Sequence, residues 1–374
     1  MKKPLGLYLH IPFCKTRCRY CDFYSTLDHH RIPDFLSALK KEILFCEKPD
    51  GFFVESLYFG GGTPSFLSIS DFAEIFHTLE KSFDISRDTE ITVEANPGTL
   101  DFQKLEGLKR LGVNRLSLGM QSLINEKLRF LGRSHDADEG RLAFDLARDA
   151  GFENISLDFI YGLPEESPFS WMEELERIVA LNPEHLSLYM LGIESETPLG
   201  RDLALGRIAA PDEGMVAELF RLTLAHTEAL GYPWYEVSNF AKGERFRSRH
   251  NQGYWDGRPW LALGPGAHGF FNSRRFANTA NLDRYIEILL SENRIPREME
   301  EEITSEKARV EALYLGFRTR KGILLQDFDR VLNTSFVSDY GDLIRFYEKK
   351  GYLLCENGFC RLTEEGLVFL DAVT

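Results

Sequence analysis

Three cysteines near the start of the chain have the spacing of a metal-binding loop. Cys14, Cys18 and Cys21 are four and three residues apart and follow an alternating apolar run. A structural zinc site takes four ligands, usually as two separated pairs, and the sequence has no second pair at such spacing. A cubane iron–sulfur cluster has four irons, so three thiolates leave one iron open to an outside ligand. The spacing favours a cluster over its alternatives, a degraded zinc knuckle or three buried core thiols.

The elements that must position this loop alternate along the first half of the chain. Segments with helical periodicity separate short runs that are typical of strands. These runs cover residues 5–11, 54–60, 90–96, 115–121, 154–161 and 185–191. Strands that alternate with helices predict a parallel sheet, and six units rather than eight predict an open, partial barrel. The expected fold class is therefore α/β.

Polar or small residues share one face of the predicted strands. In residues 5–11, leucine and isoleucine alternate with Tyr8 and His10, and other runs repeat the alternation. Because side chains change face at every residue, one face meets the helices and the other faces a lumen that must hold water or a ligand. Ligands of βα barrels bind at the C-terminal ends of the strands. The residues expected at those ends are Tyr8, Glu94, Gln121 and Asp158. Scattered solvated residues are the plain alternative.

Two further segments have unusual composition. The second predicted strand ends in the glycine run Gly60 to Gly62, followed by Thr63, and glycine lets a backbone approach a ligand closely. Later in the chain, three arginines precede the run His250-Asn251-Gln252-Gly253-Tyr254-Trp255, and His268 follows between glycines. Taken alone, a glycine turn and a histidine–aromatic cluster more often serve packing than binding.

The last part of the chain changes pattern again. Helical patterns at about 304–317, 324–332 and 337–350 precede two short strands around an Asn-Gly turn, and a final helix is expected at 363–372. Helices followed by a hairpin predict an α+β, winged-helix-like domain. Such domains usually bind DNA, but this segment has no strong basic excess, so we expect a covering or docking role. Residues 294–304 are the expected linker. Cys355 and Cys360 flank the hairpin turn and could pair, but we expect them to stay reduced in a reducing cytosol.

Composition excludes some classes of function. The chain has 374 residues, with 44 basic and 58 acidic side chains and a net charge of −14, which argues against a nucleic-acid-binding protein. Neither a signal peptide nor a membrane span is expected. Six cysteines, three of them in the loop, do not resemble a disulfide framework. We therefore expect a cytoplasmic protein.

Taken together, these motifs resemble the radical S-adenosylmethionine (SAM) proteins, in the branch related to coproporphyrinogen oxidase. The resemblance runs over nearly the whole chain and implies a [4Fe–4S] cluster held by Cys14, Cys18 and Cys21, with SAM on the open iron. It also implies two groups of contacts to SAM. Tyr8, Gly61 and Glu94 resemble contacts to the cluster-bound SAM, and the other implied residues resemble contacts chiefly to a second SAM molecule. The implied residues are Tyr8, Tyr20, Gly61, Gly62, Thr63, Glu94, Gln121, Arg133 and Asp158.

That branch holds oxygen-independent coproporphyrinogen III oxidases and a group of haem chaperones, and three features of this chain resemble the chaperones. The oxidases carry a further cysteine where this chain has Phe23, and they have a longer N-terminal extension. The run from His250 to Trp255 matches a His-Asn-x-x-Tyr-Trp motif associated with haem binding in the chaperones. Imidazole suits haem iron, aromatic rings suit the macrocycle, and Arg245, Arg247 and Arg249 suit propionates. The implied haem contacts are His250, Asn251, Tyr254 and Trp255, and the sequence leaves open whether His250 or His268 touches the iron.

The resemblance implies a partial (β/α)6 radical-SAM barrel at 1–200, a haem-binding extension at 201–295 and a C-terminal domain at 300–374. It implies delivery of haem to respiratory haem proteins, with a transient encounter at the membrane surface and a homodimer as one arrangement. No residue is expected to be catalytic, and we expect the cluster and SAM to regulate transfer. The alternatives are a coproporphyrinogen III oxidase, in which a 5′-deoxyadenosyl radical starts a decarboxylation, and a radical SAM enzyme acting on another substrate.

Overall fold

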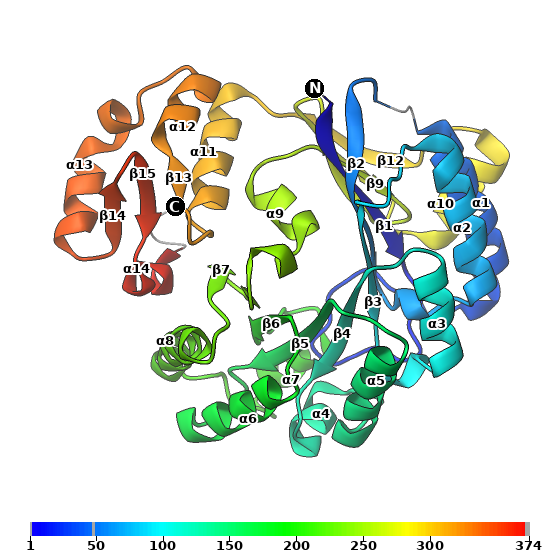
Figure 1. Ribbon diagram of the computed structural model, residues 1–374, viewed down its shortest axis with the longest axis horizontal. Coiled ribbons are helices and arrows are strands. Elements are labelled where there is room, and N and C mark those ends of the chain that lie inside the picture. The colour runs from blue at the N-terminus through cyan, green and yellow to red at the C-terminus, as the bar shows by residue number, and fades with distance from the viewer. Residues whose placement is uncertain (1, 47–48, 371–374) are drawn as a thin grey trace.

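The computed structural model describes residues 2–46 and 49–370 (Figure 1). Its centre is a run of six neighbouring parallel strands in the order of the sequence. They are β1 (Lys3–Ile11), β2 (Phe52–Gly61), β3 (Glu90–Ala95), β4 (Arg115–Gln121), β5 (Ile155–Tyr161) and β6 (His185–Met190). The six predicted runs match these strands to within two residues at each end. The partial barrel and the α/β fold class are confirmed.

Helices cover the outer face of this sheet (Figure 1). They are α1 (Ile32–Phe45), α2 (Ile69–Ser82), α3 (Phe102–Arg110), α4 (Asn125–Leu131), α5 (Ala137–Asp149), α6 (Pro168–Ala180), α7 (Pro198–Ala204) and α8 (Glu213–Ala229). Capping boxes begin α2, α5 and α6. In each, the side chain of the N-cap residue accepts from the backbone amide three residues later, and the side chain of that later residue accepts from the N-cap amide. Short turns of helix lie at η1 (His29–Arg31), η2 (Pro64–Phe66), η3 (Pro97–Thr99) and η4 (Glu244–Phe246).

Strands from the second half of the chain extend the sheet at both edges. Beside β6 lie β8 (Asn239–Ala241) and β7 (Trp234–Glu236), and beside β1 lies β9 (Trp260–Leu263), which is parallel to it. Next come β10 (His268–Phe271), β11 (Arg274–Asn278) and β12 (Arg297–Glu302), so β1 to β12 form one 12-stranded sheet. The segment α10 (Leu282–Glu287) and η5 (Ile288–Glu292) joins β11 to β12.

The predicted linker at 294–304 was wrong. Most of it is the edge strand β12, which pairs with β11 from Arg274 opposite Glu302 to Asn278 opposite Arg297. Its acidic residues are accommodated because arginines lie across the pair, and Nη1 of Arg274 is 2.9 Å from Oε1 of Glu300. An acidic run is typical of a solvated linker, and a cross-strand arginine can equally hold it in a sheet.

The predicted alternation decides which side chains enter the core. Leu7, Leu9 and Ile11 are fully buried under the helices, as are the equivalent residues of the neighbouring strands. The opposite face is concave and polar. Helix α9 (Arg249–Trp255) lies within this concavity, between the sheet and the C-terminal unit (Figure 1). A segment of the chain therefore fills part of the lumen that the sequence assigns to water or ligand.

The C-terminal unit has the predicted α+β, winged-helix-like character. It contains α11 (Ser305–Gly316), β13 (Ile323–Leu324), α12 (Leu325–Leu332), α13 (Phe336–Lys349), β14 (Leu353–Glu356), β15 (Phe359–Leu362) and α14 (Glu364–Val368). The hairpin turns at Asn357 and Gly358, both with positive φ. Residues 371 and 372 of the predicted final helix lie outside the described residues. The unit contacts α8 through the bidentate pair of Arg221 with Glu365.

The expectation of two free thiols at this hairpin was also wrong. Cys355 and Cys360 are direct partners across the two strands, and their sulfur atoms form a disulfide. The two-residue turn sets the register that brings them opposite each other.

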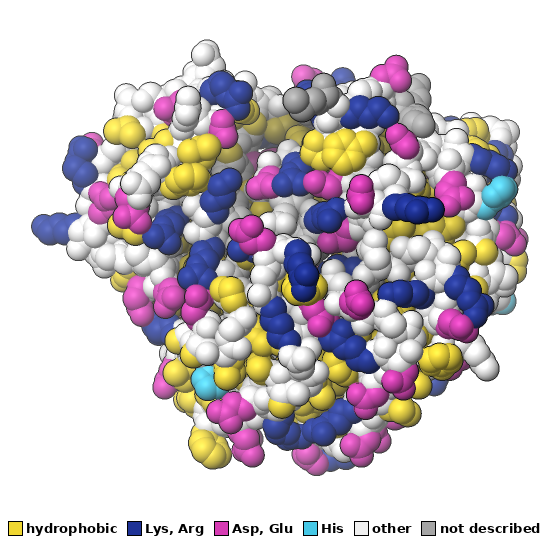
Figure 2. Space-filling view, viewed as in Figure 1, with side chains coloured by type: hydrophobic (Ala, Val, Ile, Leu, Met, Phe, Trp, Pro, Cys, Tyr) yellow, Lys and Arg dark blue, Asp and Glu magenta, His cyan; other side chains and the backbone are white. Residues whose placement is uncertain are grey.

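Charge and hydropathy agree with the fold. On the face shown in Figure 2, acidic and basic side chains are interspersed, with no broad area of basic residues. None of the helices in the described part of the chain has the length and apolar character needed to cross a bilayer.

Candidate functional site

A cavity of about 410 Å³ lies at the C-terminal ends of the parallel strands. It is lined by eleven of the residues predicted for the cluster and SAM: Cys14, Cys18, Tyr20, Cys21, Gly61, Gly62, Thr63, Glu94, Gln121, Arg133 and Asp158. Tyr8 is not on its lining but lines a larger neighbouring space, with its ring centroid 6.2 Å from that of Tyr58. Residues from β2, β3, β4 and β5 and from the cysteine loop thus meet in one place.

The glycine run packs the cysteine loop against the sheet. The amide of Gly62 donates to the carbonyl of Ile11 at 2.9 Å, and the amide of Thr63 donates to the carbonyl of Phe13 at 2.8 Å. A Cβ on Gly62 would lie 2.9 Å from the Pro12 carbonyl group and 3.0 Å from Sγ of Cys14. Gly61, at φ 110°, packs as closely on the ring of His10. These glycines are therefore required for the loop itself, whatever else they bind.

The three thiols suit a cluster better than a single metal ion. In residues 2–46 and 49–370, no three His, Cys, Asp or Glu side chains converge on one metal ion. A cubane differs, because each thiolate binds a separate iron and the thiols must surround a space. The three cysteines are half-buried around the cavity. Burial raises the pKa of the Cys21 thiol to about 11, so cluster binding must displace its proton.

Buried charges form the floor of the cavity. The hydroxyl of Tyr58 donates to Oε1 of Glu94 at 2.8 Å, and the hydroxyl of Ser117 donates to Oδ2 of Asp158 at 2.8 Å. Burial raises the pKa of both carboxyls, to about 7 for Glu94. The guanidinium of Arg115, which is 2% exposed, opposes this rise. The floor can therefore hold or release a proton near neutral pH, and it attracts the cationic parts of a ligand.

A second polar group stands over the cysteine loop. Nη2 of Arg133 donates to Oδ1 of Asn96 and, at 2.8 Å, to the carbonyl of Gly119. Its Nη1 lies 3.4 Å from Sγ of Cys18 and 3.4 Å from the hydroxyl of Tyr20. Gln121 adopts φ 63°, a conformation costly for a residue with a side chain and concentrated at functional sites. The strand end is thus held in a strained form beside this arginine.

Sequence reasoning missed several residues of this site, among them Asn96 and Arg115. Both line the cavity. Asn96 lies two residues after Glu94, and Arg115 lies two residues before Ser117, so both fall on the polar face that the alternation identifies. The signal was present in the strand parity, but a residue at the very start or end of a strand was not followed into the lumen.

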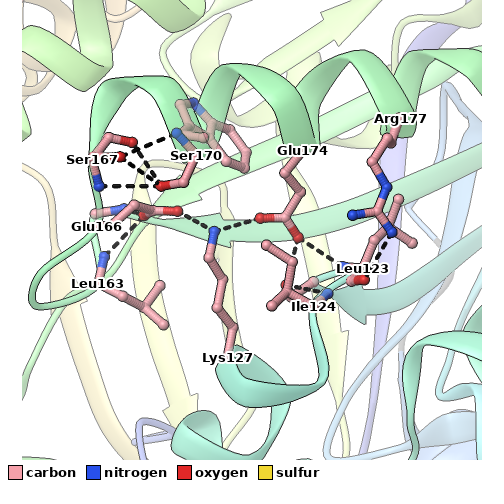
Figure 3. Close-up of polar contacts among 12 residues, drawn as sticks. Leu123, Ile124, Lys127, Leu163, Glu166, Ser167, Ser170, Glu174 and Arg177 are labelled. Atoms are coloured by element: carbon pink, nitrogen blue, oxygen red, sulfur yellow. Dashed lines mark hydrogen bonds and ion pairs between the residues drawn. The ribbon is translucent and has the colours of Figure 1, made fainter.

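A buried ion cluster fixes the loops that leave β4 and β5 (Figure 3). The ammonium of Lys127 contacts Glu166 and Glu174, whose side chains are each 1% exposed. Glu174 also accepts from the amide of Leu123 at 2.7 Å, and Glu166 accepts from the amide of Gly162 at 2.6 Å. The cluster thereby connects the segment after β4, which follows Gln121, to the segment after β5, the strand that carries Asp158.

A larger cleft of about 1300 Å³ opens between the barrel and the C-terminal unit. Its lining includes Tyr254 and Trp255 of the aromatic motif, together with Arg247. Asn251 lines the smaller cavity instead. The two spaces adjoin, because Asp22, Phe23, Gly61 and Glu94 line both. Helix α9 therefore contributes Asn251, near its start, to the smaller cavity and Tyr254 and Trp255, at its end, to the larger cleft.

His250 lies behind this cleft and not within it. It is 3% exposed and lines no part of the larger space. Its Nδ1 lies 2.9 Å from the hydroxyl of Ser56, and its Nε2 lies 2.7 Å from the hydroxyl of Tyr254. Burial lowers the pKa of its imidazole to about 3, so the ring is neutral. As it stands, His250 orients Tyr254 and has no free ring nitrogen. Of the three arginines, Arg249 bonds the carbonyl of Asp88 at 2.7 Å, and only Arg247 lines the cleft.

Six parallel βα units with a three-cysteine loop at their C-terminal edge define the class of radical SAM proteins. A model of the Radical SAM superfamily matches residues 8–178, and one of the HemN C-terminal domain matches residues 303–369. The chain belongs to the HemW family of radical SAM proteins.

Relatives named Heme chaperone HemW carry this assignment. The chain is 32% identical to one from Bacillus subtilis over 96% of its own length and 95% of that protein. It is 37% identical to one from Mycobacterium tuberculosis over 86% of its length and 84% of the relative. Among solved structures, it superposes on coproporphyrinogen III oxidase (HemN) from Escherichia coli with a TM-score of 0.84, covering 100% of this chain and 89% of that one at 23% identity. This last likeness shows the shared fold.

Proposed function

We propose that this protein is a haem chaperone that binds haem, SAM and a [4Fe–4S] cluster and delivers haem to respiratory haem proteins. The observation that carries the proposal is the cleft of about 1300 Å³, whose wall includes Tyr254 and Trp255 and which adjoins the cysteine cavity. Ligand pockets usually measure about 300–1,000 Å³, so a macrocycle has room there. The names of the relatives support the same function.

The residues around the smaller cavity fit the cluster and SAM. Cys14, Cys18 and Cys21 supply the thiolates, and the floor of Glu94 and Asp158 suits the cationic parts of SAM. When bound, a reduced cluster supplies one electron to the sulfonium of SAM. Nothing in the haem-delivery role requires that step, so we assign the pair a regulatory role. Helix α9 supports this view, because Asn251 and Trp255 reach the two spaces from one short helix.

In this proposal, the division of labour follows the chain. Residues 1–200 hold the cluster and SAM, 201–295 supply the haem-binding motif, and 300–374 close the cleft. Delivery takes place in the cytoplasm, in a transient encounter at the membrane surface where respiratory acceptors lie, and a homodimer is one assembly in which it would occur. The mixed surface charge of Figure 2 and the net charge of −14 fit protein partners better than nucleic acid.

The rival function is an oxygen-independent coproporphyrinogen III oxidase. The resemblance places a further cysteine of the oxidases at the position of Phe23. Here that phenylalanine is 65% exposed at the junction of the two spaces. An apolar ring cannot supply the acid–base or redox chemistry of a thiol, so this position favours binding over turnover.

The test is anaerobic reconstitution of the cluster, followed by haem titration and by incubation with coproporphyrinogen III and SAM on the same sample. Stoichiometric haem binding without decarboxylation supports the chaperone, and decarboxylation without tight haem binding overturns it. Cys18→Ser serves as a control. We expect it to lose the cluster absorbance, because one iron loses its ligand, and to keep haem binding because Cys18 does not line the cleft. If Cys18→Ser and His250→Ala each abolish both cofactors, the two sites are not separable.

A further inference from the structure

One histidine of the chain faces the larger cleft without a hydrogen-bond partner. His268 is the first residue of β10, its side chain is exposed, and it lines the cleft. Among the described residues, its imidazole forms no hydrogen bond, in contrast to His250, whose two ring nitrogens are both engaged. A ring with free nitrogens at the wall of a large cleft is available to a metal-containing ligand.

The backbone of His268 is held firmly. The indole Nε1 of Trp260 donates to its carbonyl at 2.8 Å, and His268 pairs with Ala277 across β10 and β11. A Cβ on the next residue, Gly269, would lie 2.3 Å from the ring of Phe276, so only glycine fits there. A ligand residue fixed on a strand in this way keeps its geometry when the ligand leaves.

Apolar and aromatic side chains line both sides of the cleft that His268 also lines. Trp255, Trp260 and Phe270 line the barrel side of the cleft. Helices α11 and α12 face them from the C-terminal unit with Ala312, Leu315, Val331 and Leu332, and Val331 is 72% exposed although it is apolar. An apolar wall left open to solvent across from aromatic rings is suited to a sandwiched macrocycle.

Two cations of the cleft lack a close carboxylate partner and lie over aromatic rings, Lys321 at 5.7 Å from the Phe359 centroid and Arg247 at 5.6 Å from that of Tyr235. Lys321 is exposed and forms no ion pair within the described part of the chain, and Arg247 has only a distant one, with Nη1 at 3.8 Å from an exposed Glu244 carboxylate. The other cations of the cleft are already paired. Arg275 lies 3.0 Å from Glu311, and Arg320 lies 2.6 Å from Glu228.

We infer that His268 is the axial ligand of the haem iron, with Lys321 and Arg247 binding the propionates, and that His250 is a positioning residue for Tyr254. This inference rests on the proposed haem-binding function and adds the ligand and the orientation. His268 provides the nitrogen, the two walls provide the apolar slot, and the cations provide the charge that a haem requires.

The test is a titration of the reconstituted, full-length chain with ferric haem, followed by absorption and electron paramagnetic resonance. We expect His268→Ala to lose the imidazole-ligated spectrum and to bind haem at least about 10-fold more weakly, with added imidazole restoring the spectrum. Lys321→Ala should bind a few-fold more weakly with an unchanged spectrum. His250→Ala should also weaken binding and leave the ligand spectrum unchanged. The matched control is His77→Ala, an exposed histidine on α2 far from the cleft lining.

The outcomes separate this inference from the proposed function. Tight haem binding by the wild type, with His268→Ala spectrally identical to His77→Ala, overturns the ligand assignment and leaves the chaperone function standing. Loss of the imidazole spectrum in His250→Ala alone would move the ligand to His250 and overturn the inference too. If the wild type binds no haem at all, both the inference and the proposed function fail.

Discussion

Nη1 of Arg133 lies 3.4 Å from Sγ of Cys18, although 115 residues separate them in the chain. The same guanidinium bonds Asn96 and the carbonyl of Gly119, so it ties the cysteine loop to the ends of β3 and β4. Gly119 makes this possible, because a Cβ there would lie 2.9 Å from the side-chain amide of Gln121 and 3.1 Å from that of Asn96. One arginine thus couples the cluster loop to the predicted SAM contacts.

Replacing this arginine should separate SAM binding from cluster binding. In Arg133→Lys, the ammonium cannot reproduce a planar fork that serves four partners at once. We expect SAM affinity, measured by equilibrium dialysis on the reconstituted protein, to fall about 10-fold, which corresponds to about 1.4 kcal/mol. Iron content should stay near that of the wild type. Arg129→Lys, exposed on α4, is the control. Unchanged SAM affinity in Arg133→Lys would show that the arginine serves the fold alone.

The glycine run predicts a second effect, on the cluster itself. In Gly62→Ala, the new Cβ would press on the Pro12 carbonyl and on Sγ of Cys14, so the loop must shift. We expect iron and sulfide content after reconstitution to fall by at least about half, with thermal stability lowered by about 1–3 kcal/mol. Gly98→Ala is the matched control, since a Cβ at Gly98 meets nothing within 4 Å. Equal iron content in the two variants would contradict the packing argument.

The ion cluster of Figure 3 predicts a large loss of stability. Lys127→Met leaves Glu166 and Glu174 buried without their shared cation. Removing one partner of a buried pair typically costs about 3–5 kcal/mol, which urea unfolding should report. Lys40→Met breaks a more exposed pair with Glu74 and should cost less than about 1 kcal/mol. Adding Glu166→Gln and Glu174→Gln to Lys127→Met should recover part of the loss. Equal effects of the two lysine substitutions would rule out the buried-charge explanation.

A buried carboxyl at the edge of the cleft predicts a pH dependence of stability. Burial raises the pKa of Glu236 to about 7, above its ordinary value of 4.5. The folded state then binds more protons than the unfolded state between these values, so stability falls as pH rises from about 4.5 to 7 and is level above that. Glu236→Gln should flatten this fall by about 2–3 kcal/mol, seen in melting temperatures from pH 5 to pH 8. Glu298→Gln, on the exposed edge strand, should keep the wild-type slope, and an identical slope in Glu236→Gln would contradict the assignment.

The pattern of local sequence predicted the barrel and most of the small cavity. Parity within each strand depends only on the alternation of neighbouring side chains, so it gave Glu94 and Asp158 their face before any packing was known. The spacing of the three cysteines and the glycine run were equally local. Arg133 was different, because nothing in its neighbourhood separates it from a solvated arginine, and only its resemblance to the family singled it out.

The larger cleft and the role of His250 were decided by the tertiary structure. A sequence motif gives the order of the side chains along the chain but not how deeply the helix that carries them is buried. Because α9 packs against the concave face of the sheet, the hydroxyls of Ser56 and Tyr254 lie within hydrogen-bond distance of the two ring nitrogens of His250. The side chain of His268 lines the cleft instead.

By itself, the sequence determined the six βα units, the three-thiolate loop and the family. It misjudged residues 294–304, because the partner of an edge strand is not visible in the residues that form that strand. It also misjudged the pair Cys355–Cys360, although the predicted two-residue turn already places these cysteines opposite each other. Pairing with β11 placed residues 297–302 at the sheet edge, and the packing of the C-terminal unit brought β10 and α11 to line one cleft. Which histidine is buried and which is open depends on that packing, so only the tertiary structure could decide it.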